Sequence, residues 1–335
     1  MRSFDYEKLA QRKWDSEILS YVAKIHEYKG RQELYIRQKP VELERLVEIA
    51  RVQSTEASNK IEGIVTTNTR IRQLVSDKTA PRNRDEKEIM GYRDVLNTIH
   101  ESHAFIPIRP AYILQLHRDL LKRTGLSYGG SFKNVQNYIN ETRPDGTQVT
   151  RFTPVAPYET PDAVAAICDS YARTLALEVL DPLLLIPTFI CDFLCIHPFN
   201  DGNGRMSRLL TLLLLYQNGF EVGKYISVEK EIERTKDVYY DVLEGADSGW
   251  HEERVGLMQE SGARSTAYDV VKAYVTSKVG KFSSAEAIAG CPSAGRSSVL
   301  SALKKLTDEG YLIRLKSGRN VAYVRSDSNT NHTVF

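Results

Sequence analysis

The chain has 335 residues and a formal net charge of +2 at pH 7, and 41% of its residues are hydrophobic and 26% charged. This composition is ordinary for a soluble globular protein, and the length allows two or three domains of the usual size. Four cysteines do not make a disulfide framework in a chain of this length, and the small net charge points to no particular partner.

The basic charge is concentrated at the C-terminal end. Residues 265–335 hold ten Lys or Arg against five Asp or Glu, so this stretch carries +5 and the rest of the chain about −3. The asymmetry is a mild indication of an anionic partner for the C-terminal part.

Membrane targeting is not expected. The start, Met1 to Tyr6, lacks the apolar core of a signal peptide. The longest apolar run, Leu209 to Tyr216, is shorter than the roughly 20 residues that span a bilayer. Cys191 and Cys195 have helical i,i+4 spacing but no matching pair of metal ligands, so we expect them to pack in the core. These features predict a protein of the reducing cytoplasm.

The first 130 residues predict helices almost throughout. Asp5 to His26 and Pro40 to Lys60 have helical apolar spacing and good helix formers. A basic loop, Lys78 to Arg84, precedes a helix that we expect Asp85 to cap and that runs to about Ser102. Pro110 opens the next helix.

The pattern then changes from helix to strand. Phe132 to Ile139 is short and mixed, Pro144-Asp145-Gly146 is a strong turn signal, and Val149 to Val155 is β-prone. We predict a β-hairpin flap inserted in a helical protein.

Helices return after the hairpin. One is expected to start at Asp162, and another at Asp181-Pro182, with Pro187 bending it or delaying its start. Arg205 to Gln217 predicts a helix that Asn218-Gly219 closes, and Ile226 to Glu244 predicts one more helix or two.

The C-terminal part changes character again. A helix from Ser265 to Lys278 is followed by helices at Ser283 to Ala289 and Gly295 to Glu309. Tyr311 to Leu315 and Asn320 to Arg325 are then predicted strands. A helix-turn-helix followed by a basic two-stranded ribbon resembles a winged helix, so we expect a small α/β domain over residues 265–335.

The stretch from His197 to Arg208, His-Pro-Phe-Asn-Asp-Gly-Asn-Gly-Arg-Met-Ser-Arg, is the most informative part of the sequence. It combines turn formers and cations directly before a leucine-rich helix. This is the layout of a polyphosphate site, in which loop amides and a helix N-terminus point at an anion.

Each polar position of this stretch suits one part of such a site. His197 is a candidate base because neutral imidazole is available near pH 7. Asp201 is a hard oxygen ligand for a Mg²⁺ that bridges phosphates. Gly202 and Gly204 allow the backbone to approach phosphate oxygens, and Asn203 can lock the loop.

Arg205 and Arg208 lie three residues apart on the first turn of the predicted helix, hence on one face. Two cations at a helix N-terminus oppose its dipole. Their presence favours a site built for an anion over a solvated helix face.

The stretch closely resembles the signature of the Fic (filamentation induced by cAMP) family, His-Pro-Phe-x-Asp-Gly-Asn-Gly-Arg-x-x-Arg, at all nine specified positions. The resemblance implies transfer of AMP from ATP to a protein hydroxyl. It implies that His197 deprotonates the hydroxyl, that Asp201 binds Mg²⁺ (or Mn²⁺), and that the amides of Gly202 to Gly204 form an anion hole. Arg205 would neutralise the leaving phosphates, and Arg208 would contact the γ-phosphate or an inhibitory glutamate.

The resemblance also implies a fold and two further groups of residues. It predicts a mainly α protein, with a Fic-type helical bundle over residues 110–262 that carries the β-hairpin flap, preceded by a helical region over residues 1–109. Asn137, Tyr138 and Ile139, with the segment Phe152 to Pro157, resemble the family's flap, which would pair with an extended target segment. In a separate group, three residues resemble the family's adenine-side residues, with core packing as the alternative: Tyr239, Tyr240 and Leu243.

Ser58-Asn59-Lys60-Ile61-Glu62-Gly63 resembles the family's inhibitory motif, within a helix over about residues 50–63. Physically, Glu62 is a carboxylate on a helix whose end Gly63 marks. If Glu62 reaches Arg208, a bidentate pair can form and occupy the partner of the γ-phosphate. We therefore expect Ser58 and Glu62 to inhibit the enzyme. The resemblance also implies that Glu62 assists AMP removal, because the same glutamate does so in some family members.

The first hypothesis is thus an autoinhibited, Mg²⁺- and ATP-dependent protein adenylyltransferase (an AMPylator, a nucleotidyltransferase) acting on Ser, Thr or Tyr of a target or of itself. The alternative is a DNA-binding regulator whose Fic core senses nucleotide with little turnover. A third reading keeps the fold but changes the phosphate-containing donor. A homodimer, and the choice between Ser, Thr and Tyr, stay open.

The predicted winged helix leaves DNA and protein partners equally open. Its second helix, which would enter the major groove, and its wing offer polar and basic side chains. These are Arg296, Ser297, Ser298, Lys304 and Lys305 on the helix, and Lys316 and Arg319 on the wing.

Overall fold

The structure is a computed structural model. It describes residues 4–38, 40–142, 146–250, 268, 271–272, 274–275, 281–291, 295–317 and 320–325. The chain divides into two compact units, Met1–Glu253 and Arg254–Phe335. Among the described residues, every helix is too short or too polar to cross a bilayer.

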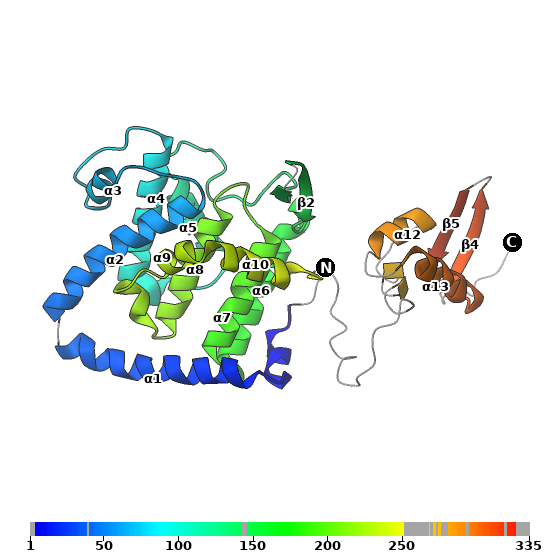
Figure 1. The fold of residues 1–335 in the computed structure, drawn as a ribbon, viewed down its shortest axis with the longest axis horizontal. Helices are drawn as coiled ribbons and strands as arrows, with labels where there is room; N and C mark the ends of the chain where they lie inside the picture. The colour runs from blue at the N-terminus through cyan, green and yellow to red at the C-terminus, as the bar shows by residue number, and fades with distance from the viewer. Residues whose placement is uncertain are drawn as a thin grey trace. The chain divides into compact units, whose positions relative to one another are not determined.

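The first unit is a bundle of helices with a single hairpin (Figure 1). Its α-helices are α1 Ser16–Gln38, α2 Pro40–Ile61, α3 Asn68–Val75, α4 Arg84–Ser102, α5 Pro110–Leu121, α6 Thr160–Ala176, α7 Pro182–Ile196, α8 Asn203–Gln217, α9 Val228–Arg234 and α10 Lys236–Asp247. Its 3-10 helices are Tyr6–Gln11, His103–Phe105, Pro157–Glu159 and Glu221–Lys224.

Helix α8 lies at the centre of this bundle, in contact with α2, α4 and α7 (Figure 1). Leu209, Leu210 and Leu213 on α8 are fully buried, as are Phe189 and Phe193 on α7. A helix that is apolar nearly all round must be enclosed by others. The N-terminus of α8, which carries the glycine-rich loop, is thereby fixed among its neighbours.

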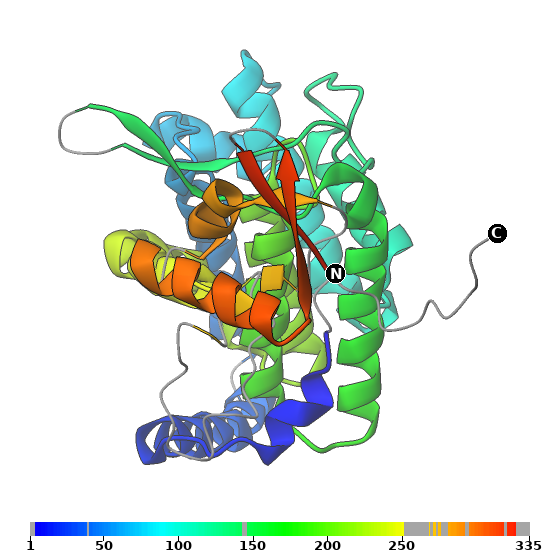
Figure 2. The same cartoon turned by 90° about the vertical axis from the view of Figure 1, so that its right-hand side faces the viewer.

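The predicted hairpin forms, but its first strand begins only at Ile139, the last residue of the segment Phe132 to Ile139, and its second strand ends at Phe152 instead of Val155. Strand β1, Ile139–Thr142, pairs antiparallel with β2, Gln148–Phe152. The register shifts between Ile139 and Asn140. The hairpin projects from the side of the helices (Figure 2).

Several helix starts differ from expectation for local reasons. The predicted helix from Asp5 is a 3-10 helix, Tyr6–Gln11, followed by α1, where the Asp15 carboxylate accepts from the amide of Glu17 at 2.7 Å. Asn83 rather than Asp85 caps α4, with its side chain accepting from the amide of Glu86.

Other helix boundaries lie at or near the predicted residues. Helix α6 begins at Thr160 instead of Asp162, and α7 begins at Pro182 and runs through Pro187 without delay. The stretch from Ile226 to Glu244 forms two helices, α9 and α10. Helix α3, capped by Thr67, was not predicted.

The second unit has its own small core. Its elements are β3 Phe282–Ser283, α12 Ser284–Gly290, α13 Arg296–Asp308, β4 Leu312–Ser317 and β5 Asn320–Arg325, with antiparallel strand order β3-β5-β4. The core includes Val271, Phe282, Val299, Leu303 and Leu306. Of the predicted helix from Ser265 to Lys278, the described residues are 268, 271–272 and 274–275, and these are helical. A capping box between Ser283 and Glu286 starts α12.

Candidate active site

His197 follows the last residue of α7 and has a left-handed backbone, with φ 51° and ψ 63°. Helices commonly end in this conformation, but glycine usually occupies the position. A side chain with Cβ populates it rarely, and a following proline restricts the residue further. The chain therefore leaves α7 at an abrupt angle that only the surrounding structure can maintain.

The side chain of His197 is held in one tautomer. Its Nδ1 lies 3.2 Å from the carbonyl oxygen of Leu194. Because a carbonyl only accepts, Nδ1 carries the proton, and Nε2 keeps a lone pair. Burial lowers the pKa of His197 to about 4. At neutral pH this imidazole is uncharged and its Nε2 can accept a proton.

Asn203 closes the loop between His197 and α8. Its side chain accepts from the amide of Phe199 at 2.9 Å and donates to the carbonyl of the same residue at 2.8 Å. Gly202 adopts φ 86° as the N-cap of α8 and offers no side-chain cap. The first turn of a helix carries amides without intrahelical partners, so this uncapped end is suited to an anion.

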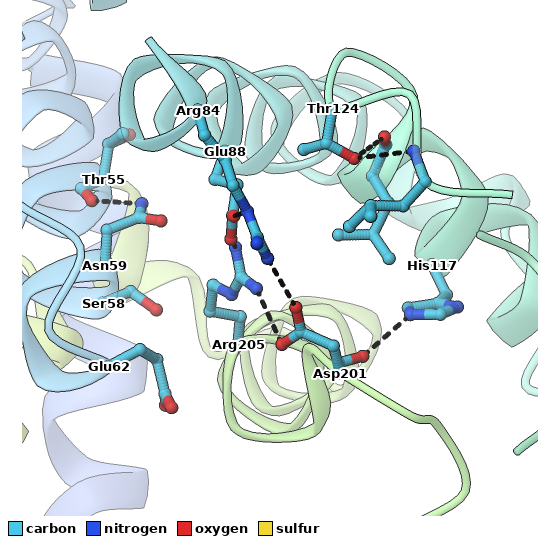
Figure 3. A network of polar contacts seen from close by, with 12 residues as sticks. Thr55, Ser58, Asn59, Glu62, Arg84, Glu88, His117, Thr124, Asp201 and Arg205 are labelled. Carbon is cyan, nitrogen blue, oxygen red and sulfur yellow. Dashed lines mark hydrogen bonds and ion pairs between the residues drawn. The ribbon is translucent and has the colours of Figure 1, made fainter. Parts of the chain in front are cut away.

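Glu62 lies against this helix end. Its Oε1 is 2.7 Å from Nη2 of Arg208, and Arg208 is buried to 2% exposure. The Nε of Arg208 donates to Ser58 Oγ at 2.8 Å, and its Nη2 donates to the Ser58 carbonyl at 2.9 Å. Figure 3 shows Ser58 in the last turn of α2 and Glu62 directly after the helix ends. The structure thus brings both expected inhibitory residues to Arg208.

The contact extends to the glycine loop itself. A Cβ at Gly204 would collide with Oε1 of Glu62 and would lie 3.3 Å from Nη1 of Arg208. The carboxylate of Glu62 therefore occupies space directly beside the first turn of α8.

Arg205 points into the protein. Its side chain is 1% exposed and its Nη1 lies 2.7 Å from a carboxylate oxygen of Glu88 on α4. Its Nη2 is 3.3 Å from Oδ1 of Asp201. The family resemblance implies a cation facing the leaving phosphates; in this structure Arg205 pairs with Glu88 and Asp201.

Arg84 and Glu88 complete a network around Asp201 (Figure 3). The Nε of Arg84 donates to Glu88 at 2.7 Å, and its Nη2 lies 3.6 Å from Oδ2 of Asp201. Both residues were missed by sequence reasoning. Their helical spacing in α4 gave no signal, because an i,i+4 pair is common on any solvated helix.

His117 supports the loop from α5, where the sequence places it only on an apolar helix face. Its Nε2 lies 3.0 Å from the Asp201 carbonyl, and its Nδ1 accepts from the amide of Gly130 at 3.1 Å. Its ring stacks on Phe199 with centroids 3.7 Å apart. Burial lowers its pKa to about 4, so the neutral ring can serve both hydrogen bonds.

Asp201 is a plausible ligand for a shared metal ion but not for a protein-enclosed one. Its side chain is 35% exposed, and the described residues contain no group of three His, Cys, Asp or Glu that could hold an ion. Mg²⁺ typically binds one or two carboxylates and completes its shell with water and substrate phosphates. The single, accessible carboxylate fits that arrangement.

Tyr239 and Tyr240 lie on α10 near Glu62 and Arg208. Burial is the main cause of the raised pKa of both phenols, and the charges of Glu62 and Arg208 also act on it. Their rings are 5.6 Å apart. Leu243 is half-buried on the same helix. The group is near enough to the helix end to bound one side of a ligand.

The three predicted flap residues are placed differently from one another. Asn137 donates to the Phe199 carbonyl at 3.0 Å, so its side chain is turned toward the His197 loop. Tyr138 is 56% exposed, and Ile139 pairs with Phe152 in the hairpin. Of the three, Tyr138 is exposed, Ile139 packs partly buried against the core, and Asn137 is hydrogen-bonded to the loop.

These features define a helical protein in which a neutral histidine, a carboxylate and an uncapped helix end meet around one loop. Residues 107–215 match the Fic/DOC family. The chain contains a Fic domain.

Curated relatives and solved structures agree with this assignment. The chain is similar to protein adenylyltransferase Fic of Culex quinquefasciatus, 26% identical over 217 residues, 62% of this chain and 39% of that protein. It is also similar to protein adenylyltransferase fic-1 of Caenorhabditis briggsae, 28% identical over 142 residues, 41% of this chain and 25% of that protein. The chain thus spans well under half the length of these relatives.

Among solved structures, a Fic family protein from Desulfovibrio desulfuricans G20 has a TM-score of 0.59 at 20% identity, covering 96% of this chain and 99% of that one. Fic-1 from Caenorhabditis elegans has a TM-score of 0.53 at 19% identity, covering 74% of each chain. These likenesses establish a mainly helical, Fic-type fold.

Proposed function

We propose that this protein is an adenylyltransferase that moves AMP from ATP to a hydroxyl side chain of a protein. The observation that carries the proposal is the pairing of a neutral His197, with Nε2 free of a proton, and the uncapped N-terminus of α8 on one loop. The curated relatives are named protein adenylyltransferases, which supports the same reaction.

In the proposed step, Nε2 of His197 takes the proton of the target hydroxyl. The hydroxyl oxygen forms a bond to the α-phosphorus of ATP, and the bond between that phosphorus and the oxygen bridging to the β-phosphate breaks. The products are AMP-protein and diphosphate. Amides of the first turn of α8 would hold the phosphate chain, and general-base assistance is typically worth 10²–10⁴ in rate.

Asp201 would hold the Mg²⁺, which supplies charge neutralisation at the phosphates when bound. Tyr239 and Tyr240 would bound the adenine side. Tyr138 and Ile139 would present the hairpin to an extended target segment through main-chain hydrogen bonds. We place the reaction in a reducing cytoplasm, with which a content of four cysteines in 335 residues is compatible.

Glu62 would keep the enzyme inhibited. Its carboxylate takes the guanidinium of Arg208 and the space beside Gly204, where the γ-phosphate would need to bind. A hydrogen bond between charged groups contributes roughly 1.5–3 kcal/mol. Removing it should therefore raise transfer by about tenfold or more, since 1.4 kcal/mol is about tenfold.

The test is label transfer by Glu62→Gly, with and without His197→Ala. α-Labelled and γ-labelled ATP are supplied with Mg²⁺ to the protein alone and to a lysate. We expect protein-bound α-label that exceeds the unmodified protein's and disappears without His197. Glu48→Gly, an exposed position on the same helix, controls for glycine in α2. Protein-bound γ-label alone, or no label in any lane while ATP binds, would contradict the proposal.

A second function is proposed for the C-terminal unit as a winged-helix module over residues 265–335 that binds an anionic partner, with DNA as the first candidate. Arg296, Lys304 and Lys305 on α13 are exposed, while Val299 and Leu303 face the core. Such a basic helix face is the side that would meet phosphates.

The test of this proposal measures the binding of a DNA duplex to the full chain by fluorescence anisotropy at increasing salt concentrations. Affinity should fall steeply with salt, and Lys304→Ala should weaken binding and flatten the slope by about one. Lys281→Ala, exposed beside β3, is the matched control. If no duplex binding is detected at low salt, DNA is excluded as the partner and a protein is the remaining candidate for this unit.

A further inference from the structure

Residues of the segment that precedes the hairpin donate hydrogen bonds to the backbone carbonyl groups of the His197 loop. Lys133 Nζ donates to the carbonyl of Ile196 at 2.9 Å, and the Lys133 amide donates to that of Pro198 at 2.8 Å. Asn137 Nδ2 donates to the carbonyls of His197 at 3.4 Å and Phe199 at 3.0 Å. Four consecutive carbonyls, from 196 to 199, are thus bound by two residues.

Lys133 and Asn137 also bind each other, and we call the pair the carbonyl clamp. Lys133 Nζ donates to Asn137 Oδ1 at 2.9 Å, which orients the amide so that its Nδ2 faces the loop. Lys133 is 3% exposed, and burial lowers its pKa to about 8. A lysine is buried at such cost only when its charge has fixed partners.

The clamp acts where the backbone is least favourable. His197 is left-handed and precedes a proline, a combination that an L-residue rarely adopts unaided. Such residues persist when the surrounding contacts over-determine them, and they cluster at functional sites. The hydrogen bonds of Lys133 and Asn137 to the carbonyls before and after His197 hold its backbone in this conformation.

We propose that Lys133 and Asn137 are positioning residues for His197, which fix its backbone and thereby its imidazole. The role of Asn137 is then to orient the base, in place of the target docking that its position before the hairpin suggests. The proposal rests on the proposed transfer reaction for its catalytic consequence, but its structural content is independent of that reaction.

Charge supports the geometry. The charged groups facing His197 are Lys133, which disfavours the imidazolium, and Glu62, which favours it. A base that remains neutral well below pH 6 keeps its lone pair free for the hydroxyl proton. Loss of Lys133 should move the pKa of His197 upward, toward its ordinary value.

The decisive measurement is ¹⁵N NMR of the histidine side chains, with the His197 signals assigned by His197→Ala. In the unmodified protein we expect the Nδ1-protonated tautomer and no titration between pH 7 and pH 5. In Asn137→Asp, which keeps Oδ1 but loses both Nδ2 donations, and in Lys133→Met, we expect mixed tautomers and titration shifted upward. Lys133→Arg, which keeps the cation, should restore most of the original signal.

Controls match each substitution. Asn140→Asp lies on the same hairpin, where Oδ1 accepts from Thr150, and Lys122→Met is exposed at the end of α5. Both should leave the His197 signals unchanged. Unaltered tautomer and titration in Asn137→Asp and Lys133→Met, at unchanged thermal unfolding, would overturn the clamp.

Kinetics in the Glu62→Gly background provide the second readout. The clamp variants should lower the turnover rate by about 10- to 100-fold with the KM for ATP nearly unchanged, because a displaced base costs rate rather than binding. A raised KM for the protein target with unchanged turnover would indicate docking and contradict the proposal. If the brake-free protein transfers no label at all, the proposed function fails while the NMR result still decides the clamp.

Discussion

The buried guanidinium of Arg205 pairs with a carboxylate more than a hundred residues away in the sequence. Arg205 is 1% exposed and Glu88 is 4% exposed, so neither charge is screened by water. Breaking a buried ion pair by removing one partner typically costs 3–5 kcal/mol, because the other charge stays buried. We predict that Glu88→Gln lowers the free energy of unfolding by about 3 kcal/mol, measured by urea denaturation.

The matched control is Glu101→Gln, at an exposed position near the end of the same helix. It should change stability by less than about 0.5 kcal/mol. Equal stabilities for Glu88→Gln and Glu101→Gln would mean that Arg205 finds another counter-charge, for which Asp201 at 3.3 Å is the available group.

The site residues that could be predicted from the sequence are those that lie close together in the chain. The loop from His197 to Arg208 could be predicted because its members share twelve consecutive positions. Glu88, His117 and Lys133 reach the loop from other helices and segments, and nothing local marks them. The ion pair between Arg205 and Glu88 was also beyond prediction, because a helix position fixes the face of a side chain but not its partner.

Helix α2 carries the inhibitory contact and is attached to its neighbours along its last two turns. Ser54 Oγ donates to Ser227 Oγ at 2.9 Å, Lys60 pairs with Glu233 at 2.7 Å, and Lys236 donates to the Ile61 carbonyl at 3.0 Å. These contacts hold the end of α2 against α9 and α10. The position of Glu62 is therefore set by the helix as a whole.

Ser58→Ala should weaken inhibition without abolishing it. The substitution removes the oxygen that accepts from Arg208 Nε and leaves that buried donor unpaired, at a cost of roughly 1–3 kcal/mol. Transfer should rise several-fold, less than for Glu62→Gly, in the same α-label assay. Thr55→Ala, nearly one turn earlier and equally buried, removes a hydroxyl that has no hydrogen-bond partner among the described residues and should leave transfer unchanged. A similar rise in both variants would refute a specific role for Ser58.

Elements with strong apolar periodicity could be predicted, as could the start of α7 at Asp181-Pro182, whereas two other elements whose starts depend on one polar side chain could not. Pro40–Ile61 was expected to within one residue, and the pair α9 and α10 was among the expectations. The early helix was wrong because Asp15 starts a separate α1, and α3 was missed because its start depends on the hydroxyl of Thr67. Both signals are single polar residues inside otherwise ordinary sequence.

The first unit as a whole is larger than the stretch that matches the family. Its core joins Phe4 and Tyr6 at the start with Trp250 at the end. Both meet at the buried Asp192 on α7, which accepts from Tyr6 at 2.9 Å and from Trp250 at 2.6 Å. The helix that ends at His197 is thus tied to both ends of the unit.

The missing side chain at Gly204 constrains how this protein can change under selection. Any Cβ there collides with Glu62, yet it also fills the space beside the first turn of α8. A substitution of Gly204 that displaced Glu62 would also place a side chain in the space beside α8 where the phosphates of the substrate would bind. Spontaneous variants selected for higher activity should therefore map to α2, at Ser58 and Glu62, and the glycine loop should stay silent in such a screen.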